Sequence, residues 1–413
     1  MTDRVVITGL GAITPLGTTW TQTWAGLTSG HSGVDRISHF DPSPFSTQIA
    51  AEVKGFDPEA SLSVKQIRRM SRASMLAVVA AREAVADAGL DPEFDGVDAA
   101  VVMNSAVSGF TEVQDATRLL DAGQARRISP RFVPSALTNM PACEIAIDLG
   151  IHGHVNASAL ACASGAHALI EARTLLRAGE ADVVIAGGCD AAITPVMFAG
   201  LTAMNAMTKN NESPQQASRP FDRDRDGFVF GEGAVVFIVE TLSHARERGA
   251  RVYAEILGGA LTSDGFNVVA PDPGAVHASA AISRALTRSG LAPDDIDMIC
   301  AHGTSTPAND RTETKAIRQA FGSAADSVAV TAPKSMTGHL IGAAGALAGL
   351  VCSMAIHEGV IPPTINYTTP DPDCDLDYVP VTARESTVRY AMTNAFGFGG
   401  QNCSVVFGSV SPP

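Results

Sequence analysis

Aromatic and charged residues are both scarce in this sequence, at 5% and 17% of the chain. No low-complexity segment occurs either, which argues against a long disordered region. Apolar and small residues fill the difference, with 46% hydrophobic residues and 38 glycines among 413 residues. This composition predicts a large core of closely packed helices and sheets, divided into two domains or forming one fused double domain.

A run of about 18 uncharged apolar residues is also missing, and the N-terminus lacks the layout of a signal peptide. We therefore expect a cytoplasmic protein that is not embedded in a membrane. The seven cysteines are scattered and include no Cys-x-x-Cys pair. Neither a disulfide framework nor a thiolate metal site is expected, which leaves a cysteine available as a nucleophile.

The net charge of −14 argues against general nucleic-acid binding, and it would repel an acidic partner unless local basic clusters act against it. Two basic clusters stand out, and for each the alternative is an ordinary solvated helix face. They are Lys65, Arg68 and Arg69, and Arg126, Arg127 and Arg131.

Short β-branched runs alternate with alanine-rich stretches along the whole chain. This alternation predicts an α/β fold with βαβ units and largely parallel, buried sheets. The runs lie at 4–9, 99–103, 182–186 and 234–240 in the first half, and at 252–257, 296–300, 327–331, 389–393 and 403–407 in the second.

One pattern occurs in both halves. Cys162 opens a helix of small residues, and His339 opens a similar helix. A duplicated architecture would make the two helix N-termini symmetry mates and bring a cysteine and a histidine to a shared centre. Two unrelated alanine- and glycine-rich helices are the alternative.

Cys162 itself follows an apolar, strand-like run at 155–161. An elbow between this strand and the helix would expose the side chain and point backbone N–H groups and the positive helix end at the sulfur. Such an environment lowers the pKa of a thiol and favours a nucleophilic thiolate. A buried structural cysteine is the alternative, and from position alone it is the commoner outcome.

Two histidines lie in glycine-containing loops. His302 follows a buried strand, where open α/β sheets place functional groups, and His339 comes five residues after Lys334. Two neutral imidazole N–H donors that converge on one oxygen would stabilise an enolate, with the lysine nearby for charge balance. Taken singly, a loop histidine is often only a capping or hydrogen-bonding residue.

A glycine-rich turn at 394–400 contains Phe396 and Phe398 and is expected to join two strands. Its backbone could supply an N–H donor while Phe398 covers an apolar tunnel. A plain hairpin with two core phenylalanines is the alternative.

Taken together, these segments resemble the β-ketoacyl-acyl-carrier-protein synthase family, and most of all its synthase II branch. The motifs, in order, are Cys162-Ala-Ser-Gly, Arg219-Pro-Phe-Asp-Arg-Asp-Arg-Asp-Gly-Phe, Ala301-His-Gly-Thr-Ser-Thr-Pro, Lys334-Ser-Met-Thr-Gly-His and Asn394-Ala-Phe-Gly-Phe-Gly-Gly. The resemblance spans essentially the whole chain and implies a condensing acyltransferase that needs no metal or other cofactor.

The resemblance further implies the thiolase fold, with two βαβ-rich halves in five αβαβα layers. The first half, 1–250, would carry the nucleophile, and the second, 251–413, the two catalytic histidines. The protein would form a homodimer, or a heterodimer with a chain-length factor. Its substrates would arrive on the phosphopantetheine arm of an acyl carrier protein.

Roles for individual residues follow from the same resemblance. Cys162 would carry the acyl group, and His302 and His339 would hold the enolate beside Lys334. The N–H groups of Cys162 and Phe398 would form an oxyanion hole. The remaining implied positions are Thr304 and Thr306 for pantetheine, Val107, Leu201, Phe396 and Asp310 for substrate binding, and Lys65, Arg68, Arg69, Arg126 and Arg127 for the carrier protein.

Two positions depart from the family pattern. Ala348 stands where a glutamate is common, and Asn309 stands where synthase II usually has glycine. These departures favour, as an alternative, a specialised ketosynthase of a type II polyketide or polyene pathway. A non-catalytic chain-length-factor subunit is a poorer match, since such subunits typically lack the nucleophile. Degradative thiolases fit less well, because they use a second cysteine in a Cys-x-Gly setting and Cys403 does not lie in such a setting. Chalcone-type synthases also fit less well, because His339 stands where they have asparagine.

Overall fold

The computed structural model describes residues 3–91, 94 and 98–410. Within them, one mixed sheet has ten strands in the order β10-β9-β13-β14-β8-β1-β7-β6-β4-β5. The strands are β1 (Val5–Ile13), β4 (Ala99–Asn104), β5 (Val155–Asn156), β6 (Val183–Asp190), β7 (Gly233–Thr241), β8 (Ala254–Ser263), β9 (Met298–Cys300), β10 (Ala329–Thr331), β13 (Tyr390–Gly397) and β14 (Gln401–Gly408).

The helices alternate with these strands, as the sequence predicts. They are α1 (Trp20–Thr28), α2 (Pro58–Ser61), α3 (Val64–Ile67), α4 (Arg72–Ala88), α5 (Phe110–Asp121), α6 (Phe132–Ala136), α7 (Met140–Leu149), α8 (Ser164–Ala178), α9 (Pro195–Ala203), α10 (Leu242–Glu247), α11 (Val276–Ser289), α12 (Pro307–Phe321), α13 (Lys334–Thr337) and α14 (Ala344–Glu358). Short 3-10 turns include η1 (Ala125–Arg127), η2 (Ala161–Ala163) and η6 (Ile341–Ala343). Two small β-ladders pair β2 (Asp35–Arg36) with β3 (Ile49–Ala50) and β11 (Val360–Ile361) with β12 (Arg384–Glu385).

The sheet consists of one five-stranded arrangement used twice. In the first half β5 lies beside β4, then β6, β7 and β1, and in the second half β10 lies beside β9, then β13, β14 and β8. Each strand has a counterpart at the same place in chain order. The two arrangements meet where β1 pairs with β8 over two residue pairs. This repetition is the duplication that the recurring helix pattern predicted.

The expectation of largely parallel sheets is wrong. Each half has two parallel pairings and two antiparallel ones, and the latter join β6 to β7 to β1 and β13 to β14 to β8. The direction of β14 follows from its three-residue turn after β13, because so short a connection can only reverse the chain. The strand-like run before Cys162 is also shorter than expected, since only Val155 and Asn156 pair with β4.

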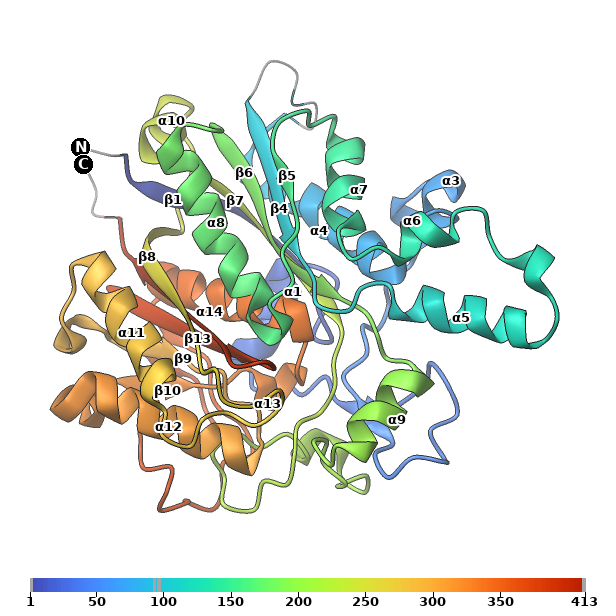
Figure 1. Ribbon diagram of the computed structural model, residues 1–413. Helices are drawn as coiled ribbons and strands as arrows, with labels where there is room; N and C mark the ends of the chain where they lie inside the picture. The colour runs from blue at the N-terminus through green and yellow to red at the C-terminus, as the bar shows by residue number, and fades with distance from the viewer. Residues whose placement is uncertain (1–2, 92–93, 95–97, 411–413) are drawn as a thin grey trace.

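Helices α8 and α14 form a layer between the two five-stranded units. The core cluster that holds their buried faces also contains side chains from strands of both halves. Helices α4 and α7 cover the other face of the first unit, and α11 and α12 cover that of the second (Figure 1). The result is the expected five-layered αβαβα arrangement of an α/β fold. The predicted domain boundary at residue 250 falls in the connection between α10 and β8.

Helix α14 is apolar on every side, as expected of a helix enclosed by the two five-stranded units. By length and composition, Ile341–Glu358 passes as a possible membrane span, but 78% of that window is buried inside the molecule. Its apolar character is therefore accounted for by the core.

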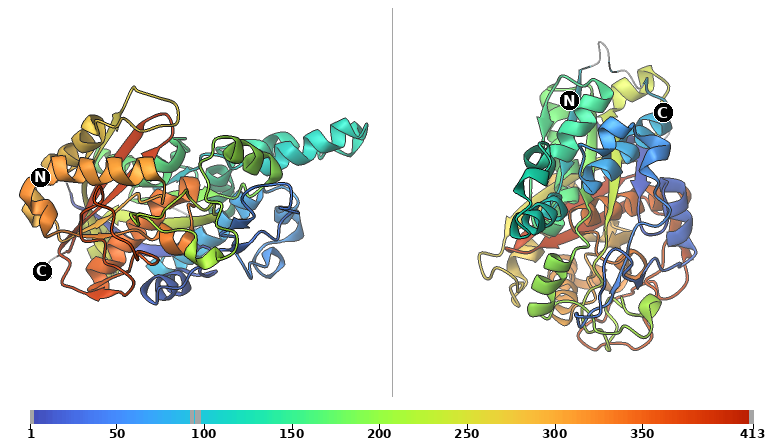
Figure 2. Two further views of the ribbon diagram at one scale, coloured as in Figure 1. Left: turned by 90° about the horizontal axis from the view of Figure 1, so that it is seen from below. Right: turned by 90° about the vertical axis from the view of Figure 1, so that its right-hand side faces the viewer.

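A helical arm projects from the body of the molecule. It consists of α5, η1 and α6, and α5 extends beyond the other elements in two directions of view (Figures 1 and 2). Large apolar side chains are exposed on this arm and on the neighbouring α7 and β5. They are Phe110, Val113, Leu120, Val133, Leu137, Ile147 and Val155.

The two central helices approach each other through glycine. A Cβ atom added to Gly165 would lie 2.6 Å from both the Ala346 nitrogen and the Gly342 oxygen, and one added to Gly345 would lie 2.5 Å from the Ala166 nitrogen. These neighbours are backbone atoms that cannot rotate away. The interface between the halves therefore requires glycine at both places.

We predict that Gly165→Ala lowers the free energy of unfolding by about 1–3 kcal/mol, because the added methyl group forces α8 and α14 apart. Gly200→Ala in α9 is the matched control, since a Cβ there would meet nothing within 4 Å. Gly200→Ala is expected to leave stability unchanged or raise it by about 0.5–1 kcal/mol through helix propensity. Urea unfolding of both variants measures the difference, and equal stability would contradict the close-approach argument.

Candidate active site

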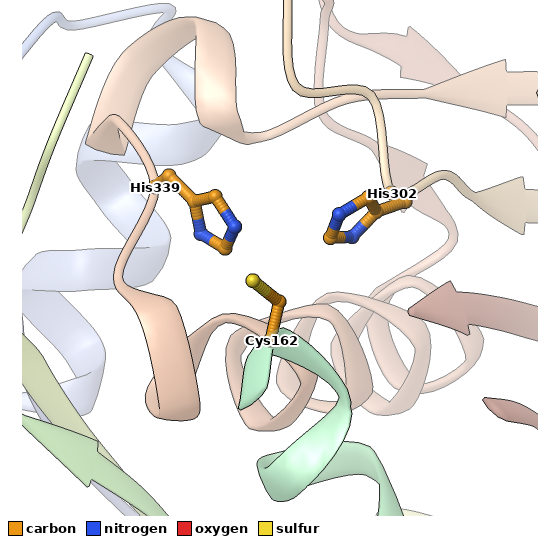
Figure 3. Close-up of side chains that lie close together, drawn as sticks. All are labelled: Cys162, His302 and His339. Atoms are coloured by element: carbon orange, nitrogen blue, oxygen red, sulfur yellow. The ribbon is translucent and has the colours of Figure 1, made fainter. Parts of the chain in front are cut away.

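Cys162, His302 and His339 meet at one point although they come from distant segments. One ligand-type atom of each lies within 4.8 Å of those of the other two, and all three residues are buried. The imidazole rings stand nearly perpendicular, with centroids 5.4 Å apart. Figure 3 shows the sulfur pointing into the space between the two rings. The constellation expected from the sequence is therefore present.

The elements that present these side chains are sharp turns at the ends of the central helices. Cys162 lies in η2, just before α8, and His339 lies just before η6 and α14. The residues that open the two turns, Ala161 and Ile341, have φ values of 47° and 52°. A positive φ is strained for a residue with a side chain and is typical of functional elbows.

The two turns are symmetry mates, but in a different register from the one expected. Both consist of a three-residue 3-10 turn and a fifteen-residue helix that ends at a left-handed glycine. In this register the counterpart of Cys162 is Gly342, and His339 lies three residues upstream. The sequence pattern pairs Cys162 with His339, whereas the backbone pairs the turn η2 with the turn η6.

A cavity of about 440 Å³ opens onto the three side chains. Most of its lining is apolar, including Met197, Phe228 and Phe230. The predicted substrate residues that line it are Val107, Leu201, Thr304, Thr306, Phe396 and Phe398. An acyl chain and a polar arm could thus share one space that the cysteine lines.

Lys334 and Asp310 are not part of this lining and lie behind it. The Lys334 ammonium donates to the His302 carbonyl oxygen and lies 3.4 Å from His302 Nδ1. Burial lowers the pKa of Lys334, although nearby acidic groups, among them Glu313, oppose this. Lys334 is thus placed to orient His302 from behind.

The hydrogen-bond partners indicate one tautomer for both histidines. The Ile341 N–H donates to His339 Nδ1 at 3.1 Å, so this nitrogen is an acceptor. His302 Nδ1 faces the Lys334 ammonium, which can only donate. In both rings the proton then belongs on Nε2. Burial also lowers the pKa of both imidazoles well below 6.5, with the Lys334 charge acting in the same direction. The site thus holds two neutral N–H donors.

A metal site is the other chemistry open to one cysteine and two histidines. Metal binding uses imidazole lone pairs, however, and in the inferred tautomer both Nε2 atoms carry protons while both Nδ1 atoms face donors. Since no cation is needed to satisfy these side chains, the arrangement suits hydrogen-bond donation to an oxygen better than metal ligation.

The expectation of a lowered thiol pKa is wrong for Cys162. Burial raises the pKa of Cys162 to about 11, and the charge of Asp190 acts in the same direction. The Lys334 ammonium and the Phe398 N–H lower it, but by less. The cysteine is therefore a thiol at rest, because the enclosure that excludes water also penalises the thiolate.

Asp310 supports the His302 loop and does not contact the cavity. Its carboxylate accepts from the Thr304 N–H at 3.1 Å and the Phe221 N–H at 2.8 Å, and lies 3.4 Å from the guanidinium of Arg225. The assignment of Asp310 to substrate binding therefore needs correction. A helix face turned inward carries this carboxylate towards the loop backbone and away from the cavity.

Glu313 is a site residue that the sequence analysis missed. Its carboxylate accepts from the N–H groups of His302 and Gly303 at 2.7 and 2.8 Å, and burial raises its pKa to about 7. Its spacing in the sequence could have identified it, since a residue three positions after Asp310 lies on the same face of a helix.

The two departures from the family pattern lie in different surroundings. Asn309 lines the cavity and donates to Asp310 Oδ1 at 3.1 Å, so its amide adds a hydrogen bond to the buried carboxylate. Ala348 is buried in the middle of α14. Lys334 retains Asp310 and Glu313 as acidic neighbours without a carboxylate at position 348.

The predicted basic clusters lie on separate elements. Lys65 and Arg68 are exposed on and just after α3, whereas Arg69 is tied to Glu144, with Arg69 Nε 2.9 Å from the carboxylate. Arg126 and Arg127 are exposed at η1 on the arm. Arg69 is therefore less available to a partner than the other four cations.

Comparison with known proteins agrees with this geometry. The family model for the N-terminal domain of beta-ketoacyl synthase matches residues 2–245, and that for the C-terminal domain matches residues 253–368. The 3-oxoacyl-[acyl-carrier-protein] synthase 2 of Synechocystis sp. is 45% identical over 98% of this chain and 97% of that protein. The protein of the same name from Coxiella burnetii is 42% identical over 98% and 99%.

Solved structures with the same fold include other ketosynthases. The ishigamide ketosynthase/chain length factor superimposes with a TM-score of 0.93 at 36% identity, with all of both chains covered. A type II polyketide ketosynthase in complex with its acyl carrier protein and bound to a hexaketide gives 0.92 at 30% identity, again over both whole chains. The fold and the cysteine–histidine site thus define a thiolase-fold condensing enzyme. Within that class, the chain belongs to the beta-ketoacyl synthase family and is an acyltransferase.

We predict that alkylation of Cys162 by iodoacetamide accelerates about tenfold per pH unit from pH 7 to 10, without a plateau, because a thiol with a pKa of about 11 yields its thiolate only gradually. Lys334→Met should slow the reaction at each pH, since it removes a cation that lowers the thiol pKa. Cys162→Ala gives the background from half-buried Cys143. A plateau near neutral pH would show that the thiolate forms at rest.

Proposed function

We propose that the chain is an elongating β-ketoacyl-acyl-carrier-protein synthase, in which Cys162, His302 and His339 carry out a decarboxylative Claisen condensation. The observation that carries this proposal is the convergence of one thiol and two neutral imidazole donors on the wall of a largely apolar cavity. The scheme needs no metal or other cofactor.

In the first step, the Cys162 sulfur attacks the thioester carbonyl of an acyl chain held on the pantetheine arm. The carrier thiol leaves, and it takes up the proton that Cys162 gives up. The Cys162 N–H and the Phe398 N–H, which is directed at the sulfur, would hold the oxyanion of the intermediate. Thr304 and Thr306 line the approach and suit contacts to the polar arm.

In the second step, a malonyl thioester loses carbon dioxide and leaves an enolate. The Nε2–H groups of His302 and His339 would donate to the enolate oxygen. This oxygen gains the negative charge as carbon dioxide leaves, so hydrogen-bond donors stabilise the transition state there. The enolate carbon then attacks the acyl carbonyl on Cys162 and forms the new carbon–carbon bond. The cysteine thiolate leaves and is reprotonated, which restores the thiol.

We predict that Cys162→Ala lowers condensation by more than about 1000-fold while malonyl decarboxylation continues, because the two imidazole donors remain. His302→Ala and His339→Ala should each lower decarboxylation roughly 100-fold or more and affect acylation of Cys162 less. Product formation from acyl- and malonyl-carrier substrates and release of carbon dioxide measure these steps separately. Normal decarboxylation in both histidine variants would reject the enolate role.

The carrier protein itself would bind through the exposed cations on α3 and η1. The chain as a whole has a net charge of −14, so an acidic carrier needs a local positive surface to approach it. Lys65, Arg68, Arg126 and Arg127 are exposed and supply such charges.

We predict that Lys65→Ser with Arg68→Ser weakens binding of the acyl carrier protein roughly tenfold at low salt, and that the difference shrinks as salt screens the charges. Arg246→Ser is the control, because it removes an exposed cation of α10 on the other side of the view in Figure 1. Calorimetric titration at two salt concentrations measures the effect. Equal affinities of the double variant and the control would rule out this surface.

The exposed apolar side chains of the arm support a dimer, either of two copies or with a chain-length-factor subunit. A monomer rarely exposes so many large apolar side chains on one projecting segment. Sedimentation of the protein alone would distinguish the two cases, because a stable homodimer forms without a second subunit.

Elongation in fatty-acid synthesis is the main candidate, since the relatives of 42–45% identity carry the name of synthase 2. A polyketide or polyene ketosynthase is the second candidate, favoured by the superimposable type II polyketide ketosynthase and by the ketosynthase/chain length factor structure. Mass spectrometry of the Cys162 peptide after incubation with saturated and polyunsaturated acyl carriers would discriminate between them.

A further inference from the structure

Asp190 is a buried carboxylate that no step of the proposed reaction uses. It is the last residue of β6 and is only 1% exposed. Its Oδ1 accepts from Ser105 Oγ at 2.6 Å and the Val107 N–H at 2.9 Å. Its Oδ2 accepts from the Ala106 N–H at 3.1 Å and the Gly342 N–H at 2.7 Å. Four donors thus occupy the acceptor positions that one carboxylate offers.

These donors belong to two different parts of the active site. Ala106 and Val107 follow β4 in the first half of the chain and line the cavity. Gly342 belongs to η6 in the second half, next to Ile341, whose N–H donates to His339 Nδ1. One carboxylate therefore contacts both the cavity wall and the turn that sets the tautomer of His339.

The contact with η6 is possible only because residue 342 is glycine. A Cβ atom there would lie 2.5 Å from Asp190 Oδ2 and 3.0 Å from the Ala106 nitrogen. Gly342 is also the symmetry counterpart of Cys162. The second elbow thus has no side chain at the position where the first carries the nucleophile, and the Asp190 carboxylate lies in that space.

The charge of Asp190 also acts on the nucleophile. This carboxylate raises the pKa values of Cys162 and Cys189. Burial raises the pKa of Asp190 to about 6, against the effect of its hydrogen bonds, so it is an anion at neutral and higher pH. Removing the charge should therefore make the Cys162 thiol more acidic.

Building on the function proposed above, we propose that Asp190 is a positioning residue for the condensation. It fixes the Ile341–Gly342 turn, so that His339 presents Nε2–H to the enolate oxygen, and through Val107 it fixes the cavity wall against the same point. Acylation requires the wall, and decarboxylation requires the donor. The carboxylate keeps the two in register.

Asp190→Asn tests this role, because its NH2 group must face at least one N–H or O–H donor that now meets an oxygen. We expect decarboxylation of malonyl carrier protein to fall about 10- to 100-fold, and the KM for the acyl carrier substrate to rise. Alkylation of Cys162 by iodoacetamide should instead become faster at a fixed pH, because the negative charge of Asp190 is gone while Lys334 and the Phe398 N–H still lower the pKa of the thiol. A purely structural role would lower both rates together.

Asp297→Asn is the matched control, since Asp297 also accepts two backbone N–H groups, from Arg389 and Tyr390, at the far end of β9. It should leave both rates at the level of the unmodified protein. Parallel loss of both rates in Asp190→Asn, or no change in either, would overturn the proposal.

Gly342→Ala provides a second test that keeps the charge. The added methyl group displaces η6 from the carboxylate, so decarboxylation should fall while the pH profile of Cys162 alkylation stays where it is. Decarboxylation at the unmodified rate in Gly342→Ala would also overturn the proposal. Failure of the proposed function is a separate result, because it would appear as absent decarboxylation in the unmodified protein.

Discussion

The close contact between α8 and α14 is the constraint on which the rest of the structure depends. These helices come from opposite halves, and they touch through backbone atoms that leave no space for a side chain at Gly165 or Gly345. Because both helices begin in strained elbows, their approach also fixes the distance between the cysteine and the histidine that precede them. The geometry of the active site therefore follows from the way in which the two five-stranded units share one helical layer.

Enclosure follows from the same packing and determines the chemistry. A site buried between the two five-stranded units loses water, and burial then favours the neutral form of each titrating group. Burial lowers the pKa of both histidines, and the resulting neutral imidazoles suit the proposed chemistry because they can donate hydrogen bonds to an enolate. The cysteine responds in the opposite direction, because its thiolate is disfavoured. Lys334 and the N–H of Phe398 compensate in part, and both are held by elements of the second half.

Much of this could be predicted from the sequence, and the errors have physical causes. Alternating strands and helices predicted the α/β class, and the motif order predicted that Cys162, His302 and His339 would meet. The prediction of largely parallel strands was wrong, because hydrophobic periodicity shows which residues are buried and does not show in which direction a strand runs. The prediction of a lowered pKa for Cys162 was wrong, because a helix N-terminus can be recognised in a sequence whereas the loss of solvent around it cannot.

Support residues were the hardest to predict. Asp310 was assigned to the substrate although it holds the loop from behind, and Glu313 and Asp190 were not singled out at all. Each of them binds backbone N–H groups of segments that lie far away in the sequence, or that turn back on themselves. Such contacts have no sequence pattern of their own, since any residue can supply the N–H group.

The buried ammonium of Lys334 gives the proposed reaction a direction. Its positive potential reaches a cavity whose other reacting groups are neutral, and it would attract the free carboxylate of an incoming malonyl unit. Loss of carbon dioxide passes that negative charge to the enolate and then to the Cys162 sulfur, where protonation neutralises it, so the lengthened chain itself carries no carboxylate for the ammonium to hold. The Lys334 ammonium would therefore favour binding of the malonyl unit without holding back the product.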